Sequence, residues 1–190
     1  MNIFFLSWVI EHCAQYHCSR HVLKMVIEYS QLLSIAHHVI NPLQAQDWTD
    51  KGLIYKKTHP NHPCSIWVRE CKENYIWLCH LGLALCKEYG YRYDKQPSDH
   101  KCYVKLLFLI LNVPNLNSNG GYITLPRLAM PDQYKTNDVI LSYRLYYLNE
   151  KARMLVWKKR SPPCWVPANL CLIHNESEQK RLIKVNKKAN

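Results

Sequence analysis

The chain of 190 residues is poor in glycine and in acidic residues, with five glycines and 14 Asp and Glu. It contains no Walker phosphate loop, no dinucleotide-binding glycine pattern, no G-x-S-x-G and no H-E-x-x-H. These absences argue against the common nucleotide-binding enzymes, the α/β-type serine hydrolases and the zinc peptidases. No apolar run approaches the roughly 18 residues that a membrane-spanning helix requires, so we expect no membrane partner.

Basic residues are abundant where acidic ones are scarce. The 25 Lys and Arg produce a net charge of +11 and an isoelectric point near 9.2, which favours an anionic partner, with nucleic acid first and a membrane surface or an acidic protein behind it. Cations would neutralise phosphates while nearby aromatic rings stack on exposed bases. The plainer interpretation is a solvated basic surface. The candidate nucleic-acid-binding residues are Lys56, Lys57, His59, Arg69, Arg92, Lys158, Lys159 and Arg160.

The nine cysteines form no C-x-x-C pair and are odd in number. Three of them, Cys71, Cys79 and Cys86, recur at helical spacing, where a free cysteine behaves as a small buried hydrophobe. This pattern favours a reducing compartment over a disulfide framework. The apolar opening MNIFFLSWVI lacks the basic region and the cleavage site of a signal peptide. We therefore expect an intracellular protein.

Helical spacing of apolar residues predicts a mainly α protein, a compact single-domain helical bundle with long Pro/Asn/Gly-rich loops and a short extended N-terminal segment. We expect one helical domain over residues 1–165 and a basic C-terminal extension over 166–190. The expected N-terminal segment is 3–6, the expected connections are 42–58 and 112–135, and the expected helices are 9–40, 65–88, 101–112 and 136–160.

A narrow polar line runs along the first expected helix. At about 100° per residue, His17, His21, Lys24, Glu28 and Gln31 share one face of a helix that is otherwise largely apolar. In a partly dry slot, Lys24 beside two histidines would lose its proton more easily and serve as a nucleophilic amine, with Glu28 as general base. The plainer interpretation is a surface ion pair four residues apart on a helix.

The segment THPNHPC at 58–64 would complete a site if it folds over this polar line. Histidines one turn apart, such as His17 and His21, resemble half of a metal site, and His59, His62 and Cys64 are possible further ligands. No spacing matches a known zinc module, so no metal and no cofactor is expected. The candidate catalytic residues are therefore Lys24, Glu28, His17, His21 and His62.

Four segments together resemble an uncharacterised family of small proteins of tailed phages and giant DNA viruses. They are HCSRHVLKMVIEYSQLLSIAH, KKTHPNHPCSIWVRECKENYIWLCHLGLALCKEYGYRY, AMPDQYK and YRLYYLNEKARMLVWKKRSPPCW. The resemblance covers residues 1 to about 165 and implies a viral or phage protein, located in the host cytoplasm or nucleus or in the virion.

The order of elements is also similar to the phage-type pyrimidine-dimer DNA glycosylase/AP lyases. An apolar opening leads to a charged helix, then to a Pro-containing basic segment and an aromatic-rich helix that ends near GYRYD. This resemblance implies a helical DNA-repair enzyme that flips a nucleotide and attacks the sugar through its N-terminal amine, assisted by a glutamate. Here Lys24 stands near the position of that glutamate, and Glu28 follows one turn later. An amine nucleophile would be the Met1 amino group or Lys24.

The sequence therefore predicts a nucleic-acid-acting protein of viral or phage type, with a DNA-repair-like glycosylase/lyase as the leading hypothesis. Two alternatives remain open at this point. One is a non-catalytic DNA-associated or virion protein in which the polar line is structural. The other is a histidine-dependent metal enzyme.

Overall fold

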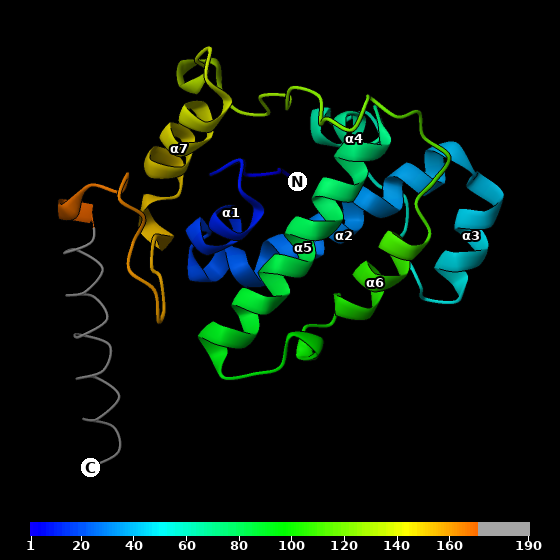
Figure 1. The fold of residues 1–190 in the computed structure, drawn as a ribbon, viewed down its shortest axis with the longest axis horizontal. Coiled ribbons are helices and arrows are strands. Elements are labelled where there is room, and N and C mark those ends of the chain that lie inside the picture. The colour runs from blue at the N-terminus through cyan, green and yellow to red at the C-terminus, as the bar shows by residue number, and fades with distance from the viewer. Residues whose placement is uncertain (171–190) are drawn as a thin grey trace.

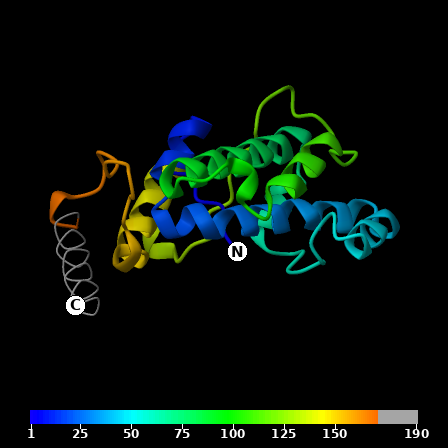
Figure 2. The ribbon, with the colours of Figure 1, turned by 90° about the horizontal axis from the view of Figure 1, so that it is seen from below.

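The computed structural model describes residues 1–170, which are mainly helical and contain no strand (Figure 1). Two long helices, α2 and α5, lie side by side through the centre, and the shorter helices pack around them (Figure 2). The α-helices are α1 (Ile10–Tyr16), α2 (Ser19–Ile40), α3 (Pro42–Asp50), α4 (Pro63–Val68), α5 (Lys72–Tyr93), α6 (Tyr103–Leu111) and α7 (Val139–Glu150). Short 3-10 helices are η1 (Pro97–Asp99), η2 (Asp132–Tyr134) and η3 (Ala152–Met154). The expected mainly α fold is confirmed.

No helix of the described residues is long and apolar enough to cross a membrane. The eight cysteines in this part of the chain are all free, and seven of them are buried, as expected for small hydrophobes. The expected basic extension at 166–190 lies almost entirely outside the described residues, which end at 170.

The N-terminal segment runs extended into the centre of the molecule. Ile3, Phe4, Phe5 and Leu6 are almost completely buried, and the segment lies among α2, α5 and α7 (Figure 1). Phe5 stacks on Trp77 of α5 with ring centroids 4.7 Å apart, a contact beyond simple area burial. This burial holds the beginning of the chain against the middle of α2.

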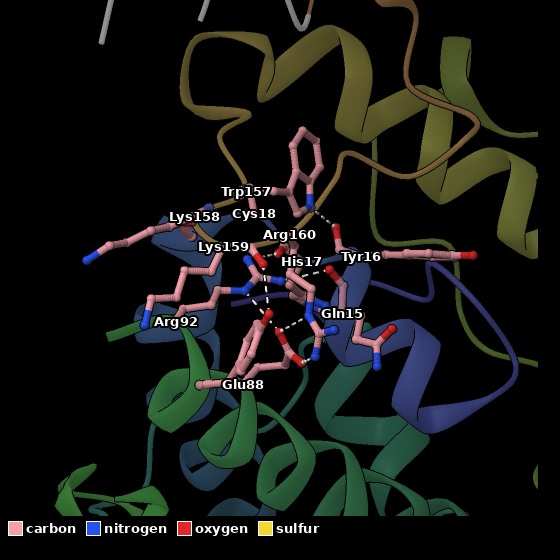
Figure 3. Close-up of polar contacts among 12 residues, drawn as sticks. Gln15, Tyr16, His17, Cys18, Glu88, Arg92, Trp157, Lys158, Lys159 and Arg160 are labelled. Atoms are coloured by element: carbon pink, nitrogen blue, oxygen red, sulfur yellow. Dashed lines mark hydrogen bonds and ion pairs between the residues drawn. The ribbon is translucent and has the colours of Figure 1, made fainter. Parts of the chain in front are cut away.

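The single helix expected over 9–40 is interrupted at His17 and Cys18, whose backbones are extended. Side chains from distant parts of the chain donate hydrogen bonds to carbonyl oxygens that a continuous helix would pair with its own amides (Figure 3). Buried Arg92 donates hydrogen bonds to the carbonyl oxygens of Gln15 and His17, each at 2.8 Å. The Trp157 indole donates to the Tyr16 carbonyl at 3.0 Å. These long-range bonds explain why apolar spacing alone missed the interruption.

The connection expected over 42–58 contains a helix, α3. Pro42 does end α2, but the same Asn-Pro pair starts the next helix, because the Asn41 side chain accepts a hydrogen bond from the Gln44 amide and Pro42 occupies its first turn. Only Ala45 of α3 is buried, so the segment lacks the apolar stripe by which a helix is recognised.

The helix expected over 65–88 is two helices, α4 and α5, separated at Arg69–Cys71. The His62 ring caps the start of α4, where it accepts a hydrogen bond from the Cys64 amide. Helix α5 runs three residues past Gly90 and ends where Asp94 adopts a left-handed conformation, with φ of 54°. At Gly90 a Cβ would lie 2.7 Å from the Lys95 carbonyl oxygen, so glycine is needed there for close approach rather than as a helix terminus.

Helix α6 is confirmed within two residues of its expected ends, although it is not wholly in the core because Leu111 is 82% exposed. The beginning of the helix expected over 136–160 is confirmed within three residues, because the Asp138 carboxylate accepts from the Leu141 amide at 3.0 Å and caps the helix. That helix, α7, ends at Glu150, ten residues before the expected end. Trp157 lies beyond α7, and its indole is hydrogen-bonded to the Tyr16 carbonyl oxygen at the α1–α2 interruption.

Candidate functional site

A pocket of about 470 Å³ opens where the beginning of the chain, the first half of α2 and the segment after α7 meet. We call it the amino-terminal pocket. It is lined by Met1, Asn2, Phe4, Arg20, His21, Lys24, Met25, Glu28, Ala129, Tyr146, Lys151 and Met154. Three of the five predicted catalytic residues, His21, Lys24 and Glu28, are among these.

The α-amino group of Met1 and the carboxylate of Glu28 face each other in this pocket. The Met1 nitrogen lies 3.9 Å from Glu28 Oε2, and the Asn2 amide donates to the same oxygen at 3.1 Å. Lys24 Nζ lies 3.1 Å from the other oxygen, Glu28 Oε1. Both carboxylate oxygens are therefore engaged, which fixes the carboxylate in one orientation beside the amine.

Positive charge dominates the pocket. Arg20, Lys24, Lys151 and the Met1 amino group contribute four cationic groups, against the single carboxylate of Glu28. Such a concentration of cations with one anion attracts an anionic ligand and accelerates its association. The pocket also presents aromatic surface, because Tyr146 is half-buried on its wall and Lys151 Nζ lies 5.0 Å from the centre of its ring. The arrangement fits a ligand with both phosphate and planar rings.

His62 lies at the start of α4, near the Met1 amino group and Glu28. Its Nδ1 accepts a hydrogen bond from the Cys64 amide at 3.2 Å. Partial burial lowers the pKa of His62, the positive charges of the Met1 amino group and His59 lower it further, and Glu28 opposes them. Cys64 Sγ in turn contacts Asn2 Oδ1 at 3.5 Å. Through His62 and Cys64, the segment 58–64 therefore lies close to the amino-terminal pocket.

His17 is not part of the pocket, and this corrects its prediction as a catalytic residue. The ring is fully buried, with Nδ1 2.7 Å from the Cys13 carbonyl oxygen and Nε2 2.9 Å from the Tyr29 hydroxyl oxygen. Burial lowers the pKa of His17 to about 4, so the ring is neutral at pH 7. The Tyr29 hydroxyl also accepts from the Phe4 amide. His17 thus stabilises the buried N-terminal segment.

His21 is buried as well, but its ring reaches the pocket wall. It stacks on Phe4 with centroids 4.8 Å apart, and its Nδ1 lies 2.8 Å from the Tyr147 hydroxyl oxygen. Burial lowers the pKa of His21 to about 3, assisted by the neighbouring positive charges of Lys151 and Lys24. His21 is therefore a neutral polar group in a cationic pocket.

Lys24 does not occupy the dry slot that its prediction as a nucleophile requires. Its side chain is 69% exposed, and desolvation is what would make a lysine amine more nucleophilic.

The described residues also contain no group of three or more His, Cys, Asp or Glu that could hold a metal ion. The rings of His17 and His21 are 6.3 Å apart and are engaged by different tyrosines.

Arg92 is 0% exposed, and this does not fit its prediction as a nucleic-acid contact. Its Nε donates to Glu88 at 2.9 Å and its other nitrogens hold the α1–α2 interruption (Figure 3). Arg160 joins the same cluster, 2.5 Å from the second oxygen of Glu88. Both arginines have a structural role here.

The other predicted nucleic-acid contacts do not gather at the amino-terminal pocket. Arg69 donates to the Pro60 carbonyl oxygen at 2.6 Å and thereby fixes the segment before α4. Lys56 and Lys57 are exposed at a separate hollow of about 390 Å³ beside α3. The remaining three, His59, Lys158 and Lys159, are exposed and do not line the pocket.

Three residues of the pocket carry its charge and aromatic surface but were missed in the sequence. Arg20 lies one position beside the polar line, while Tyr146 comes from α7 and Lys151 directly follows that helix, more than 100 residues along the chain from α2. No local spacing links Tyr146 and Lys151 to α2, so the only signal in the sequence for these pocket residues is the type of their side chains. No protein-family model matches the chain, and no curated protein and no solved structure is significantly similar to it.

Proposed function

We propose that this protein acts on DNA as a glycosylase/AP lyase, with the Met1 α-amino group as nucleophile and Glu28 as its acid–base partner. The observation that carries the proposal is the 3.9 Å approach of the Met1 nitrogen to the Glu28 carboxylate in a cationic pocket. It agrees with the activity implied by the resemblance to phage-type glycosylase/AP lyases, which pair an N-terminal amine with a glutamate.

Met1 is better placed than Lys24 to act as the nucleophile, because its side chain is largely buried beside Glu28, whereas that of Lys24 extends into solvent. Lys24 then serves to hold Glu28 in place through its 3.1 Å ion pair.

The reaction at an abasic site follows from these positions. The Met1 ammonium first gives a proton to the Glu28 carboxylate, and the resulting amine adds to the C1′ aldehyde of the opened deoxyribose. One proton of the amine passes to the aldehyde oxygen, which becomes a hydroxyl. The Glu28 carboxyl then gives its proton to this hydroxyl, which leaves as water and leaves an iminium between the amine nitrogen and C1′. The Glu28 carboxylate accepts the C2′ proton, and the electron pair of that C–H bond expels the 3′ phosphate and cleaves the strand. Borohydride reduces the iminium to a stable secondary amine.

The pocket offers contacts both for the phosphates and for the base or sugar of a nucleotide. Arg20, Lys24 and Lys151 would neutralise phosphates, and the Tyr146 ring offers a surface on which a base or an opened sugar packs. A nucleotide must leave the duplex stack to reach the amine, which is the general solution for chemistry on a base.

The test is borohydride trapping with the full chain on two duplexes, one with an abasic site and one with a pyrimidine dimer. We expect a covalent adduct whose peptide map places the DNA on the N-terminal residue. Lys24→Arg should retain the adduct, because arginine keeps the ion pair with Glu28. Glu28→Gln should lower the trapping rate by about 100-fold, the usual contribution of a general acid–base group.

Glu11→Gln is the matched control, because Glu11 is exposed on α1 and lines no part of the amino-terminal pocket. It should leave trapping unchanged. An adduct on Lys24 would reject Met1 as the nucleophile. Absence of any adduct with either duplex, together with retained DNA binding, would instead identify a non-catalytic DNA-associated protein.

A further inference from the structure

His21 has one nitrogen that the protein uses and one that it does not. Nδ1 contacts the Tyr147 hydroxyl, while Nε2 has no hydrogen-bond partner among the described residues. The only buried side-chain N or O atom in that part of the chain without a partner is Trp165 Nε1. His21 Nε2 is therefore reached by solvent, although the residue as a whole is 4% exposed. Since His21 lines the amino-terminal pocket, this nitrogen is available to a ligand there.

The hydrogen bonds of Tyr147 determine which nitrogen carries the proton. Its hydroxyl oxygen accepts from the Cys18 amide at 2.9 Å, and its single hydrogen is then free to be donated. An imidazole nitrogen is a much stronger acceptor than the neighbouring Cys18 thiol, so the hydroxyl hydrogen goes to His21 Nδ1, 2.8 Å away. A neutral ring that accepts at Nδ1 carries its hydrogen on Nε2.

The ring is held rigidly in this orientation. Phe4 stacks on one face at 24° between the planes, and Tyr147 meets the ring edge to face at 5.1 Å. Phe4 is 3% exposed and Tyr147 is 0% exposed, so both aromatic contacts lie in the protein interior. Burial among these aromatic groups also keeps the ring neutral, so His21 presents a fixed and uncharged N–H to the pocket.

We propose that His21 is a specificity-determining residue that donates a hydrogen bond from Nε2 to a phosphate oxygen of the nucleotide in the amino-terminal pocket. The inference rests on the proposed function. Cations attract phosphate from any direction, whereas an N–H donor is effective only when the acceptor lies along its axis. With four cationic groups already present, an uncharged donor adds direction without further repulsion. His21 thereby positions the sugar relative to the Met1 amine.

The experiment separates binding from chemistry by using a fluorescent duplex with a tetrahydrofuran residue at the abasic position. This residue has no aldehyde, so it binds without forming an iminium. His21→Gln keeps an N–H donor near the position of Nε2, whereas His21→Asn keeps an acceptor for Tyr147 and is too short to reach the ligand. We expect Gln to bind within about threefold of the original protein and Asn roughly tenfold more weakly, the loss of one hydrogen bond to a charged group.

Replacing the phosphate beside the tetrahydrofuran residue with a methylphosphonate should remove the difference between the two variants. His80→Asn, on the exposed face of α5, is the control and should bind as the original protein does. Equal binding by the Gln and Asn variants would overturn the proposal. So would a persistent tenfold difference on the methylphosphonate duplex, which would assign the contact to another group of the DNA.

A second measurement needs no variant. Long-range proton–nitrogen NMR of the unaltered protein should show His21 as the neutral tautomer with hydrogen on Nε2, and the opposite tautomer would overturn the proposal. The proposed function fails independently, through absence of a borohydride adduct in the original protein. The binding comparison distinguishes the two failures, because it does not depend on the reaction.

Discussion

Arg92→Met removes the guanidinium at the centre of the α1–α2 interruption while keeping most of the apolar stem. Three contacts are lost, namely those to Glu88 at 2.9 Å and to the Gln15 and His17 carbonyl oxygens at 2.8 Å each. Each carbonyl loses a hydrogen bond to a charged donor, worth about 1.5–3 kcal/mol. Glu88 keeps its ion pair with Arg160, so it is not left uncompensated. We expect a loss of about 3–5 kcal/mol in the free energy of unfolding.

The assay is equilibrium urea unfolding. With a slope of about 2 kcal/mol per molar, a loss of 4 kcal/mol lowers the midpoint by about 2 M. Arg160→Met is the matched control, since its side chain is 32% exposed and bonds the same glutamate. A partly exposed ion pair contributes about 1 kcal/mol or less. Equal losses for the two variants would refute the reasoning, because the carbonyl contacts would then contribute nothing.

The remaining predictions concern pH, packing and charge. Burial lowers the pKa of His17 to about 4 and that of His21 to about 3, so the unfolded chain binds more protons below its ordinary histidine pKa. The contribution of these neutral histidines to the free energy of unfolding should be fully present above about pH 6.5. It should fall by about 1.4 kcal/mol per pH unit for each histidine as the pH drops toward 4. In urea unfolding at several pH values, His17→Gln should lower the slope of stability against pH by about 1.4 kcal/mol per pH unit, and an unchanged slope would contradict the assignment. In thermal unfolding, Gly90→Ala should cost about 1–3 kcal/mol, because the added Cβ meets backbone, whereas Gly82→Ala meets only a leucine side-chain end and should cost less. Lys24→Ala should reduce the salt dependence of DNA affinity by about one phosphate contact, measured by fluorescence anisotropy.

The amino-acid sequence by itself determined the elements whose signals are local. Apolar spacing predicted α6 closely, and the Asp138 cap and Pro42 marked true helix boundaries. The Lys24–Glu28 ion pair also followed from sequence, because helix geometry brings residues four apart together wherever the helix lies. Within one helix, spacing is a sufficient guide to proximity.

Only the tertiary structure decided which of these groups lie together in the amino-terminal pocket. Buried Arg92 interrupts the first helix and leaves His17 in the core, through bonds to residues 75 and 77 positions away that no local pattern contains. Burial of the N-terminal segment brings the Met1 amine to Glu28, 27 residues along the chain. The physical reason is that hydrogen bonds and apolar packing between distant segments outweigh local helix propensity, and their partners are chosen only when the chain is folded.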